Sequence, residues 1–193
     1  PLRILAILEY LGADISIDRA SHIVTVDSRA LQNKALPYEM TKTTTGAFGL
    51  AGALLGRFGV VDIGKPGGDK IGPRPVDVHL SALRALGASV SEYDESIRAK
   101  MVGDASDVHH LTMPSVGAVV NYLLAAVNVS RPVRLRGTPI DNDMAALCEM
   151  LEECGIEIHY DTEGEISIAS HGYDTESTHV IECPPDRNVA MTW

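Results

Sequence analysis

The chain has 193 residues, of which 45% are hydrophobic and only 5% aromatic, and its formal net charge at pH 7 is −10. This length fits one domain or one lobe of a larger protein, with a core made mainly of Ala, Val, Ile and Leu. Such an acidic balance argues against a nucleic-acid surface.

Neither a membrane nor a metal is expected as a partner. The most apolar run, residues 46–55, is far shorter than the ~20 residues that a membrane span needs. No signal peptide is visible. The cysteines Cys148, Cys154 and Cys183 lack metal-ligand spacing, which favours buried, reduced thiols in a cytoplasmic protein. We expect no cofactor.

The N-terminal residues 2–11 have the apolar spacing of a helix, and the chain enters this pattern directly from Pro1. The chain stops at Trp193, shortly after a new apolar stretch begins. Both ends therefore predict that the chain is part of a longer polypeptide.

A repeat follows, in which each copy has a helix that stops at a glycine: Gly12, Gly87 or Gly155. Glycine suits the left-handed position after a helix. Two short alternating stretches come after each glycine and predict a hairpin; they are residues 14–18 and 22–27, 89–93 and 96–102, and 157–161 and 165–169.

Two further helices precede the later copies. Thr45-Gly46-Ala47 opens an apolar helix that runs to about residue 58, and Ser115-Val116-Gly117-Ala118 opens another that runs to about residue 127. The β-branched strands 60–63 and 133–135 follow them. A helix that is hydrophobic all round is buried, and Gly52 and Gly56 would let neighbouring helices approach closely. The unit is therefore helix, strand, loop, helix, hairpin, with a strand ahead of it. Its length of about 70 residues exceeds that of a solenoid repeat and predicts three subdomains around a shared core, helices inside and sheets outside.

The segment 64–77 combines four glycines, three prolines, two lysines, one arginine and two aspartates. This composition predicts an irregular, exposed loop. The cations Lys65, Lys70 and Arg74 precede a predicted helix, whose free N–H groups also favour anions. The carboxylate of Asp69 would be repelled by a bound anion unless it holds a proton or takes part in the chemistry.

Simpler interpretations remain for some of these residues. The loop is not a nucleotide P-loop, because Pro73 and Arg74 follow the glycine where that motif has Lys-Ser/Thr. Asp77 is equally consistent with an N-cap of the next helix. His79, His109 and His110 lack a metal-ligand pattern, which favours core or solvated roles.

A family resemblance rests on motifs that occur in order along nearly the whole chain. They are Pro37-Tyr38-Glu39 with Lys42-Thr43, Leu54-Leu55-Gly56-Arg57-Phe58-Gly59, Pro66-Gly67-Gly68-Asp69-Lys70-Ile71-Gly72-Pro73-Arg74-Pro75-Val76-Asp77-Val78-His79-Leu80, Ser115-Val116-Gly117-Ala118 and Pro185-Asp186-Arg187. Together they resemble the UDP-N-acetylglucosamine enolpyruvyl (1-carboxyvinyl) transferases, in the superfamily of EPSP synthase. The resemblance implies an α/β fold, an inside-out α/β barrel of βαβαββ units, three per domain. Residues 1–183 would be one domain, its first repeat truncated, and residues 184–193 a crossover into an absent second domain.

The resemblance also implies an activity: transfer of the enolpyruvyl group of phosphoenolpyruvate to a sugar-nucleotide hydroxyl, for peptidoglycan synthesis. Asp69 takes the place of the loop's catalytic residue, usually cysteine, and would protonate the methylene carbon. Aspartate is not the soft nucleophile that cysteine is, so insensitivity to fosfomycin is expected. The positions matched to substrate binding are Arg74, Pro75, Val76, Asp77, Val78, Ser115, Val116 and Gly117.

Two positions depart from the family pattern. Thr45 and Met113 stand where an arginine and a lysine are expected, and the loss of two charge-assisted contacts would weaken binding of a diphosphate by orders of magnitude. Lys42, Lys65 or Lys70 would have to compensate. Otherwise the acceptor is a different molecule, such as a nucleoside monophosphate, or the protein is a non-catalytic nucleotide-sugar-binding homologue. The fragment alone is expected to be inactive.

Overall fold

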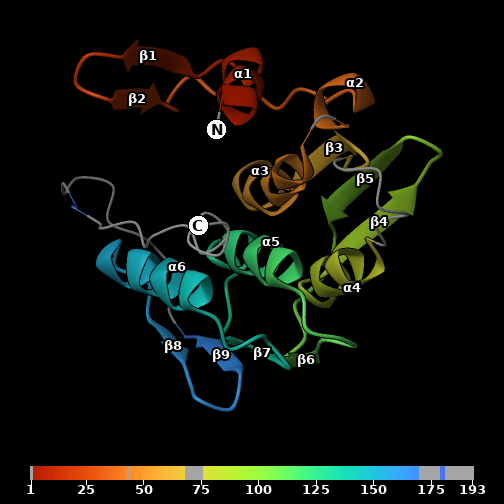
Figure 1. The fold of residues 1–193 in the computed structure, drawn as a ribbon. Coiled ribbons are helices and arrows are strands. Elements are labelled where there is room, and N and C mark those ends of the chain that lie inside the picture. Colours follow the sequence, from red (N-terminus) through yellow and green to blue (C-terminus); the bar gives the residue numbers. More distant parts are fainter. Residues whose placement is uncertain (1, 43, 68–75, 170–178, 181–193) are drawn as a thin grey trace, which may run out of the picture.

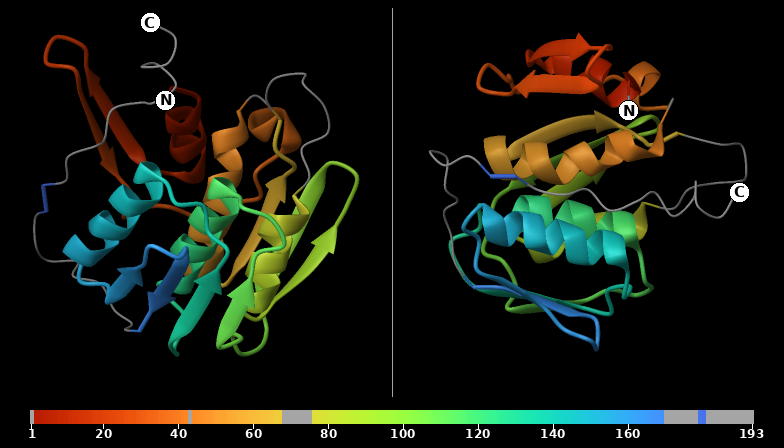
Figure 2. Two further views of the ribbon diagram at one scale, coloured as in Figure 1. Left: turned by 60° about the horizontal axis from the view of Figure 1, so that its bottom comes forward. Right: turned by 60° about the vertical axis from the view of Figure 1, so that its left-hand side comes forward.

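The computed structural model describes residues 2–42, 44–67, 76–169 and 179–180. Four of the predicted site residues, Asp69, Lys70, Arg74 and Pro75, lie outside these ranges, as do Cys183 and the expected crossover at residues 184–193. The helices of residues 50–58 and 116–126 lie in the middle of the molecule, with the sheets toward the outside, while the helices of residues 2–11 and 38–41 lie to one side (Figures 1 and 2).

The first copy of the repeat consists of α1 (Leu2–Leu11), β1 (Asp14–Asp18) and β2 (Ile23–Asp27). The two strands pair antiparallel, with Asp14 opposite Asp27. Asp18 closes the turn by accepting hydrogen bonds from the backbone N–H of Ala20 and the hydroxyl of Ser21. A short aspartate side chain suits this role because it mimics a backbone turn.

In the second copy, a single parallel bridge between Leu36 and Ile63 stands where the repeat has its first strand. Its elements are α2 (Tyr38–Thr41), the 3₁₀ helix η1 (Thr45–Gly49), α3 (Leu50–Phe58), β3 (Val60–Gly64), α4 (Asp77–Ala85), β4 (Ala88–Glu92) and β5 (Ser96–Met101). The strands form a sheet in the order β3-β5-β4. The helix expected at 46–58 therefore begins as a 3₁₀ turn, a common form of a helix start.

The third copy shows the whole unit. Its elements are β6 (Val108–His110), α5 (Val116–Ala126), β7 (Val133–Arg136), α6 (Asn142–Glu153), β8 (Ile158–Tyr160) and β9 (Glu165–Ile168). The sheet order is β6-β7-β9-β8, with β6 parallel to β7 and the other pairs antiparallel. The order strand, helix, strand, helix, hairpin confirms the predicted unit, including the strand ahead of it.

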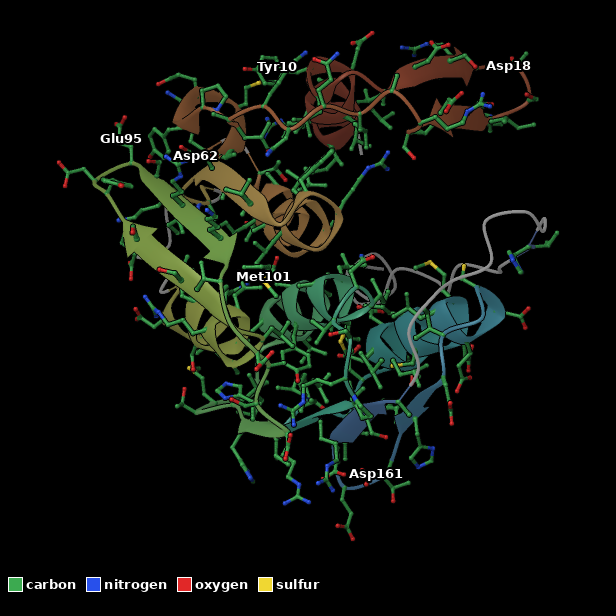
Figure 3. The ribbon with its side chains drawn as sticks, turned by 180° about the vertical axis from the view of Figure 1, so that it is seen from behind. Tyr10, Asp18, Asp62, Glu95, Met101 and Asp161 are labelled. Atoms are coloured by element: carbon green, nitrogen blue, oxygen red, sulfur yellow. The ribbon has the colours of Figure 1, made fainter. Side chains whose placement is uncertain are left out.

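The predicted helix ends are also confirmed. Gly12, Gly87 and Gly155 have φ of 105°, 91° and 86°, values that L side chains rarely adopt. Each is followed by its hairpin, and the hairpin turns lie at the periphery, as Asp18, Glu95 and Asp161 show (Figure 3). The repeat thus sends its hairpins outward from the central helices α3 and α5.

One hydrophobic cluster links the three copies, from Ile7 in α1 through Leu55 and Leu123 to Ile166 in β9. At its centre α3 packs on α5 so closely that glycine is required. A Cβ on Gly52 would lie 2.7 Å from the Cα of Asn121, and one on Gly56 would lie 2.8 Å from the carbonyl oxygen of Leu124. Both glycines therefore serve the close helix approach predicted for them.

Two further predictions concern the cysteines and membrane-spanning helices. Cys148 and Cys154 are free thiols, but only Cys148 is buried while Cys154 is partly exposed. In the part of the chain that the structure covers, we find no helix long and apolar enough to cross a membrane.

Candidate functional site

A cavity of about 500 Å³ opens where three helices begin: η1, α4 and α5. Its lining combines these helix starts with Pro66, which lies two residues after the end of β3. The lining residues are Thr45, Gly46, Phe48, Gly49, Pro66, Val76, His79, Ser115, Gly117 and Val120. Thr45, Val76, Ser115 and Gly117, four of the predicted site residues, thus meet in one place, although they come from three separate motifs.

Ser115 fixes the start of α5. It has extended backbone angles, and its Oγ accepts a hydrogen bond of 3.3 Å from the N–H of Ala118, as an N-cap does. The N–H groups of the first turn of a helix have no acceptor within the helix and carry a partial positive charge. With Ser115 and Gly117 in the cavity wall, the start of α5 is suited to receive an anionic oxygen.

Thr45 ties the start of η1 to the segment that leaves β3. Its hydroxyl donates a hydrogen bond of 3.2 Å to the carbonyl oxygen of Gly67. Gly67 itself runs so close to α2 that a Cβ there would overlap the carbonyl oxygen of Lys42. These two contacts hold the point from which residues 68–75 depart next to the cavity.

The start of α4 corrects one interpretation of Asp77. Val76 is the N-cap residue, without a side-chain cap hydrogen bond, and Asp77 is the exposed first residue of the helix. A carboxylate there still interacts favourably with the helix dipole. Val78 is only 8% exposed and faces the interior, and neither Asp77, Val78 nor Val116 is part of the cavity lining.

His79 lies in the first turn of α4 and contributes its ring to the cavity. The ring contacts Phe48 edge-on, with centroids 5.2 Å apart, and its Nδ1 is 2.9 Å from the Nδ2 of Asn121. Burial lowers the pKa of His79 to about 4, because removing the ring from water disfavours the imidazolium. The ring is therefore neutral at physiological pH.

Charge is sparse around the cavity. Among the described lining residues there is no Lys, Arg, Asp or Glu. Lys42 forms an ion pair with Glu39 and lies over the Tyr38 ring, so its charge is already neutralised by a neighbour. Met113, at the other position where a cation was expected, is 55% exposed. Within the residues that the structure places, no cluster of His, Cys, Asp or Glu is arranged to hold a metal ion.

This arrangement offers hydroxyl, imidazole and backbone N–H groups on an otherwise apolar wall, so it suits an oxyanion or polar ring of a small molecule. His79 belongs to the loop motif, but its sequence suggested only a core or solvated role, and nothing in the sequence pointed to Phe48 or Asn121. A lone histidine indicates no chemistry until its partners are known.

A second hollow of about 400 Å³ lies where β7 begins and β9 ends, at one end of these two central strands of their sheet. It is lined by Asp107, Arg131, Pro132, Val133, Arg134, Ser167, Ile168 and Ala169. None of the predicted site residues that the structure describes lies there, and Arg131 is engaged in an ion pair with Asp107.

Comparison with known proteins agrees with the repeat and with the order of motifs. Residues 1–193 match the family of EPSP synthase (3-phosphoshikimate 1-carboxyvinyltransferase). The chain belongs to this family. Within the EPSP synthase family, it is 37% identical over 155 residues to a UDP-N-acetylglucosamine 1-carboxyvinyltransferase of Prosthecochloris aestuarii, covering 79% of this chain and 36% of that protein. It is 31% identical to one of Streptococcus pneumoniae, with the same coverage.

Solved structures show the same fold. The enolpyruvyl transferase NikO from Streptomyces tendae superposes with a TM-score of 0.73 at 20% identity, over 89% of this chain and 40% of NikO. EPSP synthase from Acinetobacter baumannii gives a TM-score of 0.67 at 19% identity, over 89% of this chain and 39% of that enzyme. This member of the EPSP synthase family thus spans about 36% of the length of the curated relatives it matches.

Proposed function

We propose that the protein containing this chain transfers the enolpyruvyl group of phosphoenolpyruvate to a hydroxyl of UDP-N-acetylglucosamine and releases phosphate, as a step in peptidoglycan precursor synthesis. The observation that carries the proposal is the cavity at the three helix starts, which collects Thr45, Val76, Ser115 and Gly117. The names of the relatives at 31–37% identity support the same substrates.

The proposal includes a second domain. Because the chain spans little more than a third of its relatives, residues 1–183 would form one domain, an inside-out barrel with the sheets outside. Residues 184–193 would cross into the other domain, and the substrates would lie between the two. A single domain would then be inactive by itself.

Asp69 is the proposed acid. The segment 68–75 joins Gly67, held next to the cavity by Thr45, to Val76 in its wall, so its ends are anchored at the candidate site. Protonation of the methylene carbon requires a carboxyl group that keeps its proton near neutral pH, which a closed site beside anions favours. Arg74 would bind phosphate through its planar, bidentate guanidinium, and Lys70 would add a second cation, with Pro75, Asp77, Val78 and Val116 at the nucleotide.

A second candidate acceptor is a nucleoside monophosphate. Thr45 and Met113 replace two expected cations, and the described part of the cavity wall carries no formal charge. One phosphate needs fewer positive charges than a diphosphate, so this wall is compatible with a smaller acceptor. A third possibility is a homologue that binds a nucleotide sugar without catalysis.

The test is phosphate release from phosphoenolpyruvate by the full-length protein, with UDP-N-acetylglucosamine or UMP as the acceptor. The proposal expects release with UDP-N-acetylglucosamine, and a loss of about 10²-fold or more in Asp69→Asn. Asp94→Asn changes an exposed carboxylate in the β4–β5 turn and should leave the rate unchanged. Release only with UMP would assign the smaller acceptor, and no release with either would favour the non-catalytic homologue.

A further inference from the structure

Three helices are joined below the cavity by one buried side chain, the amide of Asn121 in α5, which is 0% exposed. Its Oδ1 is 2.6 Å from the backbone nitrogen of Gly52 in α3, and its Nδ2 is 2.9 Å from the Nδ1 of His79 in α4. Asn121 therefore connects the backbone of one helix to the imidazole of another.

The direction of these hydrogen bonds is fixed by the backbone. A backbone N–H only donates, so the atom of Asn121 that faces Gly52 must be the carbonyl oxygen. The amide nitrogen then faces His79, and because it only donates, the Nδ1 of His79 must accept. A neutral imidazole that accepts at Nδ1 carries its proton on Nε2.

The rest of the ring faces the cavity. The ring borders it together with Phe48 and Gly117, and a Cβ on Gly117 would lie 2.8 Å from the Cε1 of His79. With Nδ1 engaged by Asn121, Nε2–H is the polar group that the ring offers to a ligand. The low pKa of His79 keeps the ring in this neutral, single-proton form.

We propose that His79 binds substrate, donating a hydrogen bond from Nε2–H to a phosphoryl oxygen of the nucleotide, and that Asn121 positions it by fixing the tautomer. The inference rests on the proposed function for the ligand, but not for the tautomer. This role of His79 explains how a wall whose described residues carry no charge prefers a phosphate over a neutral group. A hydrogen bond to a charged acceptor is stronger than one to a neutral acceptor. Gly117 contributes by leaving room for the ring.

The tautomer is measured by imidazole ¹⁵N NMR of the full-length protein labelled at histidine, at pH 7.5 and without ligand. The inference expects an unprotonated Nδ1 and a protonated Nε2 for His79. A proton on Nδ1, an imidazolium or a mixture of tautomers would overturn it. This reading uses the unmodified protein, so it does not depend on any variant folding.

Addition of UMP, and separately of UDP-N-acetylglucosamine, then tests the ligand. The Nε2–H signal should shift on saturation. If the nucleotide shifts other signals of the cavity but leaves Nε2–H unchanged, the role of His79 is overturned and the proposed function stands. If neither nucleotide binds, the proposed function fails, and the assignment of this ligand with it.

The variant Asn121→Asp tests the positioning. An aspartate of nearly the same shape still accepts from Gly52 but presents an oxygen to His79, which requires a proton on Nδ1. Because the new carboxylate also raises the pKa of His79, the comparison is made at a pH high enough to keep the ring neutral. There we expect the tautomer to reverse and nucleotide affinity to fall at least about tenfold, the order of one charge-assisted hydrogen bond. His109→Gln, in β6 and outside the cavity lining, is the control with unchanged affinity. Unchanged tautomer and affinity in Asn121→Asp would refute the positioning role.

Discussion

The contact of α3 with α5 makes a quantitative prediction for Gly52→Ala. A Cβ at this position would overlap the carbonyl oxygen of Asn121 and lie 2.7 Å from its Cα. Both atoms belong to the backbone of a buried helix, so rotation of a side chain cannot relieve the overlap. The two helices must separate, which also lengthens the hydrogen bond from Gly52 to Asn121.

Three contributions set the size of the effect. Overpacking costs about 1–3 kcal/mol, and leaving the buried Oδ1 of Asn121 without a donor costs about 1–3 kcal/mol. Alanine in place of a helical glycine returns about 1 kcal/mol. The free energy of unfolding should therefore fall by about 3 kcal/mol.

Urea denaturation followed by circular dichroism measures this change. With a slope of about 2 kcal/mol/M, the midpoint should fall by about 1–2 M. Gly49→Ala is the matched control, because a Cβ there meets only Val120 Cγ1, at 3.8 Å. Equal midpoints for Gly52→Ala and Gly49→Ala would refute the close-packing argument.

Three further predictions concern the cavity and the loop. Gly117→Ala should push the His79 ring aside, since its Cβ would lie 2.8 Å from Cε1, and calorimetry should show weaker UMP binding. Gly103→Ala is the control and should bind as before, because its Cβ would have no neighbour nearer than 4.0 Å and Gly103 is outside the cavity lining. When the pH falls from 6.5 to 4, the free energy of unfolding should fall by on the order of 3 kcal/mol more in the unmodified protein than in His79→Gln. The reason is that the histidine of the unfolded chain takes up a proton in this range, whereas the folded ring, with its pKa lowered to about 4, does not. Equal pH profiles would contradict this. Fosfomycin should leave Asp69 unmodified, and a covalent adduct there in mass spectrometry would contradict the prediction.

Much of the fold was predictable because the repeat has strong local signals. Glycine at positions 12, 87 and 155 ends a helix in each copy, and the alternating stretches that follow pair as hairpins. The limits of single elements were harder to predict. The helix α6 begins at Asn142, ahead of the apolar pattern near Leu147, because the side chain of Asp141 caps it by accepting a hydrogen bond from Asp143.

The candidate site was predictable only in part. The motifs pointed to Thr45, Val76, Ser115 and Gly117, which meet at the cavity. The roles of His79 and Asn121 depend on a hydrogen bond between residues 42 positions apart, which no local pattern in the chain reveals. For Asp77 the sequence left an N-cap and a substrate role equally open, and the structure removes the N-cap by placing Val76 there; its substrate role stays a prediction.

The central claim is that the cavity at the helix starts receives the phosphates of the acceptor. A crystal structure of the full-length protein with bound UDP-N-acetylglucosamine tests it most directly. The account predicts phosphoryl oxygens within hydrogen-bond distance of the first-turn N–H groups of α5, at Val116 and Gly117. Phosphates bound elsewhere, for example in the hollow beside Arg131 and Ser167, would contradict it.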